Sequence, residues 1–265
     1  MPPIPQESKS FWKMPPGIES FFAIAGGLAS FTARFFKEVW FPPYELKEVV
    51  RQGYNLGYSS LSLVGITGFI MGLVLTMQSQ PTLAVFGAEA WLPAMVTISV
   101  IREMGPVITA LICAGKVGSG IGAELGSMKV TEQIDAMEVS GTNPFKFIVA
   151  TRVLAVTVTL PILVFYADAI AIFGAYIGVN ITGEVSSTLF INQALRSLDW
   201  IDIIPSTIKT IFFGFGIGIV GSYMGYHATK GTAGVGQAAN SAVVISSLLV
   251  FIIDMVAVQV TQIFM

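Results

Sequence analysis

Long apolar stretches separated by short polar segments dominate the chain. A helix needs about 20 mostly apolar residues to cross a bilayer. Five segments meet or approach this length, and they cover residues 56–80, 90–114, 150–179, 206–226 and 242–264. The pattern therefore predicts an all-α polytopic membrane protein with five transmembrane helices.

A different pattern precedes these spans, in residues 18–40, where six aromatic side chains mix with Arg34, Lys37 and Glu38. Aromatic bulk beside charged residues, without a clean apolar core, is typical of a helix that lies in the membrane interface. A weak sixth span is the alternative. Residues 44–54 then predict a short polar helix that leads into the first span.

Basic residues are distributed unevenly between the two sides that five spans create. Eleven of the fourteen fall on the side of the N-terminus, and these are Lys9, Lys13, Arg34, Lys37, Lys47, Arg51, Lys116, Lys129, Lys146, Arg152 and Lys230. Because Lys and Arg accumulate in cytoplasmic loops, we expect a cytoplasmic N-terminus and a periplasmic C-terminus. The chain divides into an N-terminal cytoplasmic or interfacial region, residues 1–55, and a five-span domain, residues 56–265.

The composition supports the membrane assignment and excludes several classes of function. Hydrophobic residues make up 54% of the chain and charged residues 11%, whereas soluble domains carry about 25% charged residues. The mean hydropathy is +0.75. A net charge of -2 provides no basic face for nucleic acid. Because the chain has a single histidine, His227, and a single cysteine, Cys113, we predict no metal centre and no internal disulfide.

No ATP-binding or catalytic motif is present in the sequence. Gly115 and Lys116 are followed by Val117 where a P-loop has Ser or Thr, and Ala110 occupies the position of its first glycine. No combination of nucleophile, base and acid stands out. We therefore predict a chain without enzymatic activity or a cofactor of its own.

Glycines recur at four-residue spacing inside the spans. The pairs are Gly68 and Gly72, Gly174 and Gly178, Gly214 and Gly218, and Gly221 and Gly225. Small residues on one stripe let membrane helices approach closely, so these faces are expected to pack against other helices.

Charged residues inside the spans are functional candidates, because each costs at least a few kcal/mol at bilayer depth. Arg102 and Glu103 lie near the middle of the second span, and the kinking Pro106 follows. Either the pair borders a wet cavity, or it locks helix packing with Lys209 as the partner of Glu103. For Asp168 and Asp254, which stand singly in spans three and five, a structural hydrogen bond is the expected role.

The polar segment between spans two and three, about residues 116–147, predicts a cytoplasmic helix. In residues 131–139, Ile134 and Met137 share one face, and Glu132, Asp135 and Glu138 share another. A solvated loop helix is one interpretation. An acidic and apolar helix held between two spans also suits docking to a partner protein.

The sequence resembles the MlaE/YrbE family of permeases from lipid-transporting ABC systems. The residues that carry the resemblance are Arg102-Glu103-Met104-Gly105-Pro106, Ala123-Glu124-Leu125-Gly126-Ser127-Met128, Thr131-Glu132-Gln133-Ile134-Asp135-Ala136-Met137, Asn143-Pro144, Arg152 and Asp254. The resemblance covers nearly the whole chain from about Arg51 onward. It weakens near residues 237–240.

The resemblance implies a phospholipid or related lipid as substrate and a bacterial inner-membrane location. It implies a homodimer, a separate cytoplasmic ATPase that binds ATP and Mg, an outer-side MCE-domain protein, and a small STAS-domain protein. The residues implied for the lipid pocket are Leu75, Leu83, Phe86 and Glu103, and the charges of Arg102 and Lys209 add these two residues to the predicted pocket or cavity. Those implied for coupling to the ATPase are Glu124, Glu132, Gln133, Asp135, Met137 and Glu138.

The main alternative is a secondary transporter that is energised by ions through Asp168 and Asp254. Such transporters often consist of two related halves, and the sequence has no convincing internal repeat. A membrane scaffold without transport activity is a second alternative, but it leaves the deep Arg102-Glu103 pair unexplained.

Overall fold

The computed structural model describes residues 16–42, 44–182, 186–229 and 231–264, and every regular element within these ranges is helical. Lys9, Lys13 and Lys230, which were counted for orientation, lie outside the described residues, as do residues 1–15 of the N-terminal region. The elements are α1 (Pro16–Val39), α2 (Leu46–Val85), η1 (Glu89–Trp91), α3 (Leu92–Ser99), η2 (Val100–Met104), α4 (Gly105–Cys113), η3 (Ala114–Gly118), α5 (Ser119–Val130), α6 (Gln133–Val139), η4 (Phe145–Ala150), α7 (Thr151–Thr182), α8 (Ser187–Arg196), α9 (Trp200–Tyr226) and α10 (Thr232–Phe264).

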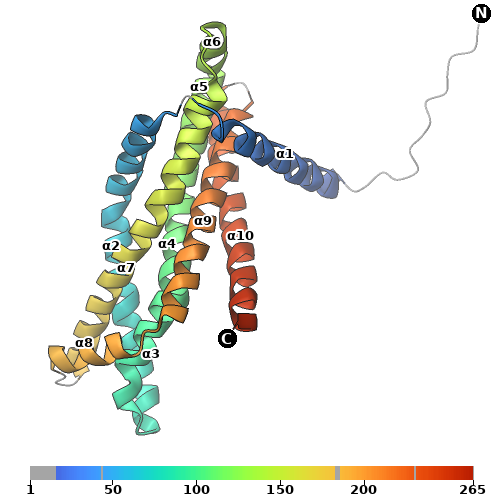
Figure 1. The fold of residues 1–265 in the computed structure, drawn as a ribbon. Coiled ribbons are helices and arrows are strands. Elements are labelled where there is room, and N and C mark those ends of the chain that lie inside the picture. Colours follow the sequence, from blue (N-terminus) through green and yellow to red (C-terminus); the bar gives the residue numbers. More distant parts are fainter. Residues whose placement is uncertain (1–15, 43, 183–185, 230, 265) are drawn as a thin grey trace, which may run out of the picture.

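Five helical stretches are long and apolar enough to cross a membrane, which confirms the predicted polytopic fold. Within the described ranges they are Leu46–Val85, Glu89–Val130, Phe145–Ile181, Trp200–Tyr226 and Thr232–Ile263. The second consists of α3, α4 and α5 joined by the π-helical turns η2 and η3. These helices form one elongated bundle, with α6 at one end and α8 at the other (Figure 1).

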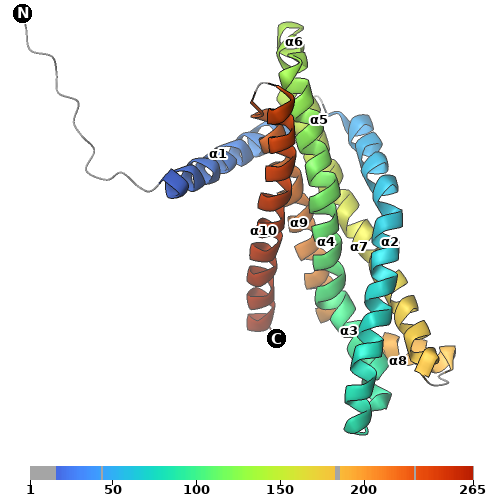
Figure 2. The same cartoon turned by 180° about the vertical axis from the view of Figure 1, so that it is seen from behind.

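Helix α1 is not among the candidate spans. It leaves the bundle sideways at the end that carries α6 (Figures 1 and 2). Its buried Phe31 and Phe35 anchor it, and the Phe31 ring packs edge-on against Phe145 at 4.9 Å between centroids. This arrangement supports the interfacial interpretation of the segment over a sixth span.

The spans extend beyond their predicted bounds. The polar helix predicted for residues 44–54 is the start of α2, which runs unbroken from Leu46 to Val85 and is about 60 Å long at 1.5 Å per residue. The helix continues through Gly53 and Gly57, which lie between the polar start and the apolar part. Helix α9 begins at Trp200 instead of residue 206, and there the Asp199 N–H donates to Asp202 Oδ2 at 3.2 Å.

Helices α2 and α7 lie side by side along the bundle (Figures 1 and 2). A Cβ added at Gly72 would overlap the carbonyl oxygen of Ala171, and one at Gly174 would overlap the carbonyl oxygen of Phe69. Each helix thus contributes glycines against the backbone of the other. This confirms the packing role predicted for these glycine stripes.

The sequence analysis missed helix α8, which lies between the third and fourth spans. Its Phe190 is buried in a cluster with Leu92 and Val96 of α3. The helix therefore covers the end of the bundle opposite α6, beside the start of the second span.

Candidate functional site

The candidate site is built on a break in the hydrogen bonding of the second span. In η2 the Gly105 N–H donates to the carbonyl of Val100, five residues back. The carbonyl of Ile101 would by the same pattern face the nitrogen of Pro106, which has no hydrogen. The buried Ser206 hydroxyl of α9 donates to that carbonyl instead, at 2.7 Å. The π-helical turn is thereby held against α9.

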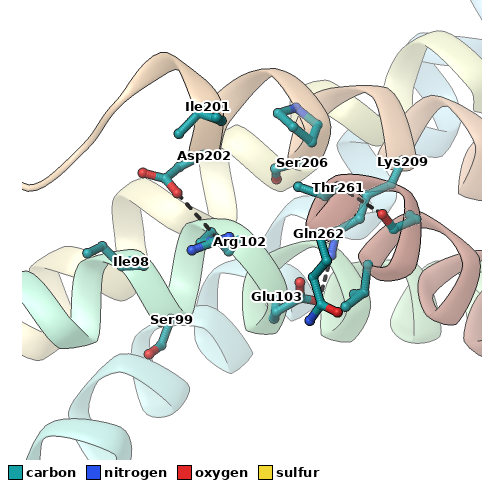
Figure 3. A pocket seen from close by; sticks show the side chains of 13 residues that line it. Ile98, Ser99, Arg102, Glu103, Ile201, Asp202, Ser206, Lys209, Thr261 and Gln262 are labelled. Carbon is teal, nitrogen blue, oxygen red and sulfur yellow. Dashed lines mark hydrogen bonds and ion pairs between the residues drawn. The ribbon is translucent and has the colours of Figure 1, made fainter. Parts of the chain in front are cut away.

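The turn presents Arg102 and Glu103 to the charged side chains of α9 and α10. Lys209 Nζ lies 2.7 Å from Glu103 Oε2 and 2.9 Å from Asp254 Oδ1. Arg102 Nε lies 3.3 Å from Asp202 Oδ1. Figure 3 shows Arg102 pointing toward Asp202, and Lys209 toward Glu103. Two cations and three carboxylates therefore meet within three spans.

Arg102, Glu103, Asp202 and Lys209 line a cleft of about 540 Å³ between α3, η2, α9 and α10. The Lys209 side chain is only 4% exposed, whereas that of Glu103 is 47% and that of Arg102 is 36% exposed. The buried Lys209 ammonium holds the carboxylates of Glu103 and Asp254 in place. The partly exposed Arg102 guanidinium and Glu103 carboxylate face the cleft. A guanidinium binds phosphate through several N–H groups, and a carboxylate accepts hydrogen bonds from an amine. The cleft therefore offers both donors and acceptors of charge-assisted hydrogen bonds.

The contact that the sequence proposed between Glu103 and Lys209 is present, and both residues also line the cleft. Asp254 makes the expected hydrogen bond, as an acceptor from Lys209. The sequence analysis missed Asp202 as a partner of Arg102, because it assigned Asp202 to a loop. The signal was available, since two aspartates three residues apart ahead of an apolar run are typical of a helix start.

The other predicted pocket residues lie away from this cleft in the single chain. Leu75 and Leu83 of α2 pack against the apolar cluster that contains Leu92 and Phe190. Phe86 caps α2 and is exposed. Their place in a lipid pocket stays a prediction.

Asp168 occupies a different environment from Asp254. It is buried beside a separate cavity of about 220 Å³ between α7 and α9. Its Oδ1 contacts Gly105 so closely that a Cβ there would overlap it, and this oxygen has no hydrogen-bond partner in the part of the chain that the structure describes. The expected hydrogen bond is therefore not made by Oδ1.

At the other end of the second span, α5 leads into the short helix α6. The helix begins at Gln133, two residues later than predicted, after Glu132 in a left-handed conformation at φ 59°. Ile134 is buried, and Met137 packs against the main core. Glu132, Asp135 and Glu138 are exposed, as expected for a helix with one acidic face.

Ion pairs attach this segment to the bundle. Lys129 Nζ lies 2.8 Å from Asp135 Oδ1 and holds α6 against the end of α5. The buried Arg152 of α7 binds both oxygens of Glu124, at 2.5 and 3.3 Å. Glu124, Gln133 and Arg152 also line a polar cleft of about 500 Å³ with the start of α2. The coupling role predicted for the segment has a rigid structural basis, although the role itself stays a prediction.

Within the described ranges, no group of three or more His, Cys, Asp or Glu side chains is arranged to hold a metal ion.

Known proteins with similar sequences are permeases. The family model described as "Permease MlaE" matches residues 49–260. A probable ABC transporter permease protein of Rickettsia typhi is 41% identical over 211 residues, which is 80% of this chain and 82% of the relative. The intermembrane phospholipid transport system permease protein MlaE of Haemophilus influenzae is 35% identical over 210 residues, 78% and 80% of the two chains. A probable ABC transporter permease protein of Synechocystis is 32% identical over 206 residues, 78% of each chain.

Proposed function

Because this chain belongs to the MlaE permease family, we propose that it moves phospholipid, as the multi-pass permease subunit of an ABC transporter. The proposed exchange runs between the inner membrane and an outer-side MCE-domain protein. The Haemophilus influenzae relative is named for intermembrane phospholipid transport, which supports this substrate class.

The observation that carries the proposal is the charged cleft inside the membrane-spanning bundle. Arg102 and Glu103 are partly exposed there, while Lys209 is buried beneath them. Charges at this depth are costly unless they serve a polar substrate or a lock. A phospholipid head group with a phosphate and an amine matches the guanidinium and the carboxylate. Apolar spans on either side suit its acyl chains.

The proposed energy source is a separate cytoplasmic ATPase that binds ATP and Mg, since the sequence has no P-loop. The docking element for this ATPase is α6, with Glu124, Glu132, Gln133, Asp135, Met137 and Glu138 as its coupling residues. We further propose a homodimer in the inner membrane, with the α6 end cytoplasmic. A STAS-domain protein completes the proposed assembly.

The proposal is tested by Glu103→Gln in the assembled complex. The complex with its ATPase and MCE partner is reconstituted in proteoliposomes, and ATP-dependent transfer of a fluorescent phospholipid is measured. We expect transfer by the natural chain and a loss of about tenfold in the variant, the factor that corresponds to about 1.4 kcal/mol of lost interaction. Glu89→Gln is the matched control, because Glu89 lies outside the cleft.

The thermal stability of each purified variant separates transport from packing. Lost transfer with unchanged stability supports a substrate-binding role. Destabilisation of Glu103→Gln that Lys209→Met relieves would instead identify a packing pair. Absence of ATP-dependent transfer by the natural complex would contradict the proposed function altogether.

A further inference from the structure

An apolar groove of about 570 Å³ runs between α9 and α10, next to the charged cleft. All of its lining residues are apolar except Lys209 and Thr261. Its walls include Ile208 and Phe212 of α9 and Val256 and Val260 of α10, each about half exposed. The cleft and the groove share five lining residues, Lys209 and Thr261 among them, so the two spaces adjoin.

Lys209 forms the boundary between the two spaces. Its ammonium is bound to Glu103, which lines the cleft, and to Asp254 of α10. The part of the side chain that remains for the groove is the methylene stem, which is apolar. The Thr261 hydroxyl donates to the carbonyl of Ala257 in its own helix, so it adds no free donor to the groove. Of the five residues that the two spaces share, Lys209 is therefore the one that gives its charge to the cleft and its apolar stem to the groove.

The dimensions of the groove match one leaflet of a bilayer. From Ile201 to Phe212 the groove follows α9 for about 16 Å, at 1.5 Å per residue. Half of a hydrocarbon core about 30 Å thick is about 15 Å. The groove begins near the start of α9, at the end of the bundle that carries α8 (Figure 1). It is therefore long enough for an acyl chain from the leaflet on the α8 side.

We propose that this α9–α10 groove binds an acyl chain of the phospholipid whose head group occupies the charged cleft, and that it is the lateral passage between that leaflet and the cleft. The proposal rests on the proposed function and specifies the route of the substrate. One amphiphile fills both spaces, whereas an apolar protein segment in the groove would leave the adjoining charged cleft without a matching group. Entry along the groove keeps the acyl chain in apolar surroundings while the head group reaches Arg102 and Glu103.

The test uses phosphatidylethanolamine that carries a photoreactive diazirine on one acyl chain, added to the full complex in proteoliposomes. Cross-linked peptides are mapped by mass spectrometry. We expect saturable labelling of the α9 and α10 segments around Ile208, Phe212 and Val256, with competition by unlabelled lipid. Val256→Trp, which fills the groove, should lower this labelling and the rate of ATP-dependent transfer by about tenfold. Ile211→Trp is the control, because Ile211 is similarly exposed on α9 but does not line the groove.

Each outcome decides between the proposals. Labelling spread evenly over all exposed span residues, without saturation, would identify ordinary surrounding lipid and overturn the groove site. Cross-links from the groove to a second copy or another subunit, formed with a photoreactive residue at Val260, would show a protein interface and also overturn it. If the natural complex transfers lipid and Val256→Trp does so equally well, the groove site fails and the transport function stands. If the groove is labelled but the complex transfers no lipid, the transport function fails.

Discussion

At the scale of single residues, one missing backbone hydrogen shapes the charged site. Pro106 cannot donate to the carbonyl of Ile101, and Ser206 from another helix supplies the hydrogen bond at 2.7 Å. A buried carbonyl without a partner is costly. The break that places Arg102 and Glu103 in the cleft therefore depends on a side chain about a hundred residues away.

Removal of the Ser206 hydroxyl should lower the free energy of unfolding more than removal of the neighbouring Thr207 hydroxyl. We expect Ser206→Ala to lower the free energy of unfolding by about 1–3 kcal/mol, because the Ile101 carbonyl is left unsatisfied. Thr207→Val should cost less than about 1 kcal/mol, because Thr207 donates to a carbonyl within its own helix. Thermal unfolding of the purified chain in detergent measures both. Equal losses in the two variants would show that the bond to Ile101 contributes nothing special.

At the scale of helices, the second span connects the two candidate functional regions. The helical stretch Glu89–Val130 carries Glu103 in the cleft and ends beside α6. Glu103 and Val130 are separated by about 40 Å along this stretch. The Lys129–Asp135 pair ties α6 to its end, and the Glu124–Arg152 pair ties the same end to α7. A displacement of α6 would therefore be passed on to the helical stretch that carries Arg102 and Glu103.

Reversal of the acidic face of α6 should uncouple the transporter. We expect the double change Glu132→Lys and Asp135→Lys to lower ATPase co-purification by about tenfold, or to leave ATP hydrolysis without lipid transfer. Glu89→Lys, a charge reversal at the opposite end of the same span, should leave ATPase binding intact. Pull-down and coupled transfer assays measure both effects. Unchanged binding and unchanged transfer in the double variant would exclude α6 as the docking element.

At the scale of the whole molecule, the two ends of the bundle differ in character. The end with α6 carries α1, the polar cleft around Arg152 and most of the basic residues. The other end carries α8 and the start of α9 (Figure 1). Because Lys and Arg favour the cytoplasmic side, this difference predicts one orientation in the membrane.

Cysteine labelling tests this orientation. The sole cysteine, Cys113, is buried, so the natural chain serves as the control that should not be labelled. We expect Asn192→Cys on α8 to react with a membrane-impermeant maleimide in intact spheroplasts. Ser140→Cys, which follows α6, should react only after permeabilisation. The reverse pattern would show that the bundle is inserted the other way round.

The sequence by itself determined the fold class, the number of spans and the family. The fold class and the number of spans follow from local composition, because a bilayer requires every spanning segment to satisfy its own backbone and to be apolar over its length. The family follows instead from short motifs such as residues 102–106 and 131–137. The charged residues of the candidate cleft were also visible, since a charge inside an apolar run is conspicuous. Helix ends were less well determined, as α2 and α9 show, because polar residues continue a helix beyond the membrane.

Only the tertiary structure decided how these residues are grouped. Local pattern contains no information on which face of one helix meets another, so the Arg102–Asp202 pair and the Ser206–Ile101 hydrogen bond could not be derived from it. The same holds for the separation of Asp168 from the charged cleft and for the α9–α10 groove. These features arise from side chains far apart in the sequence, and the packing of the spans alone brings them together.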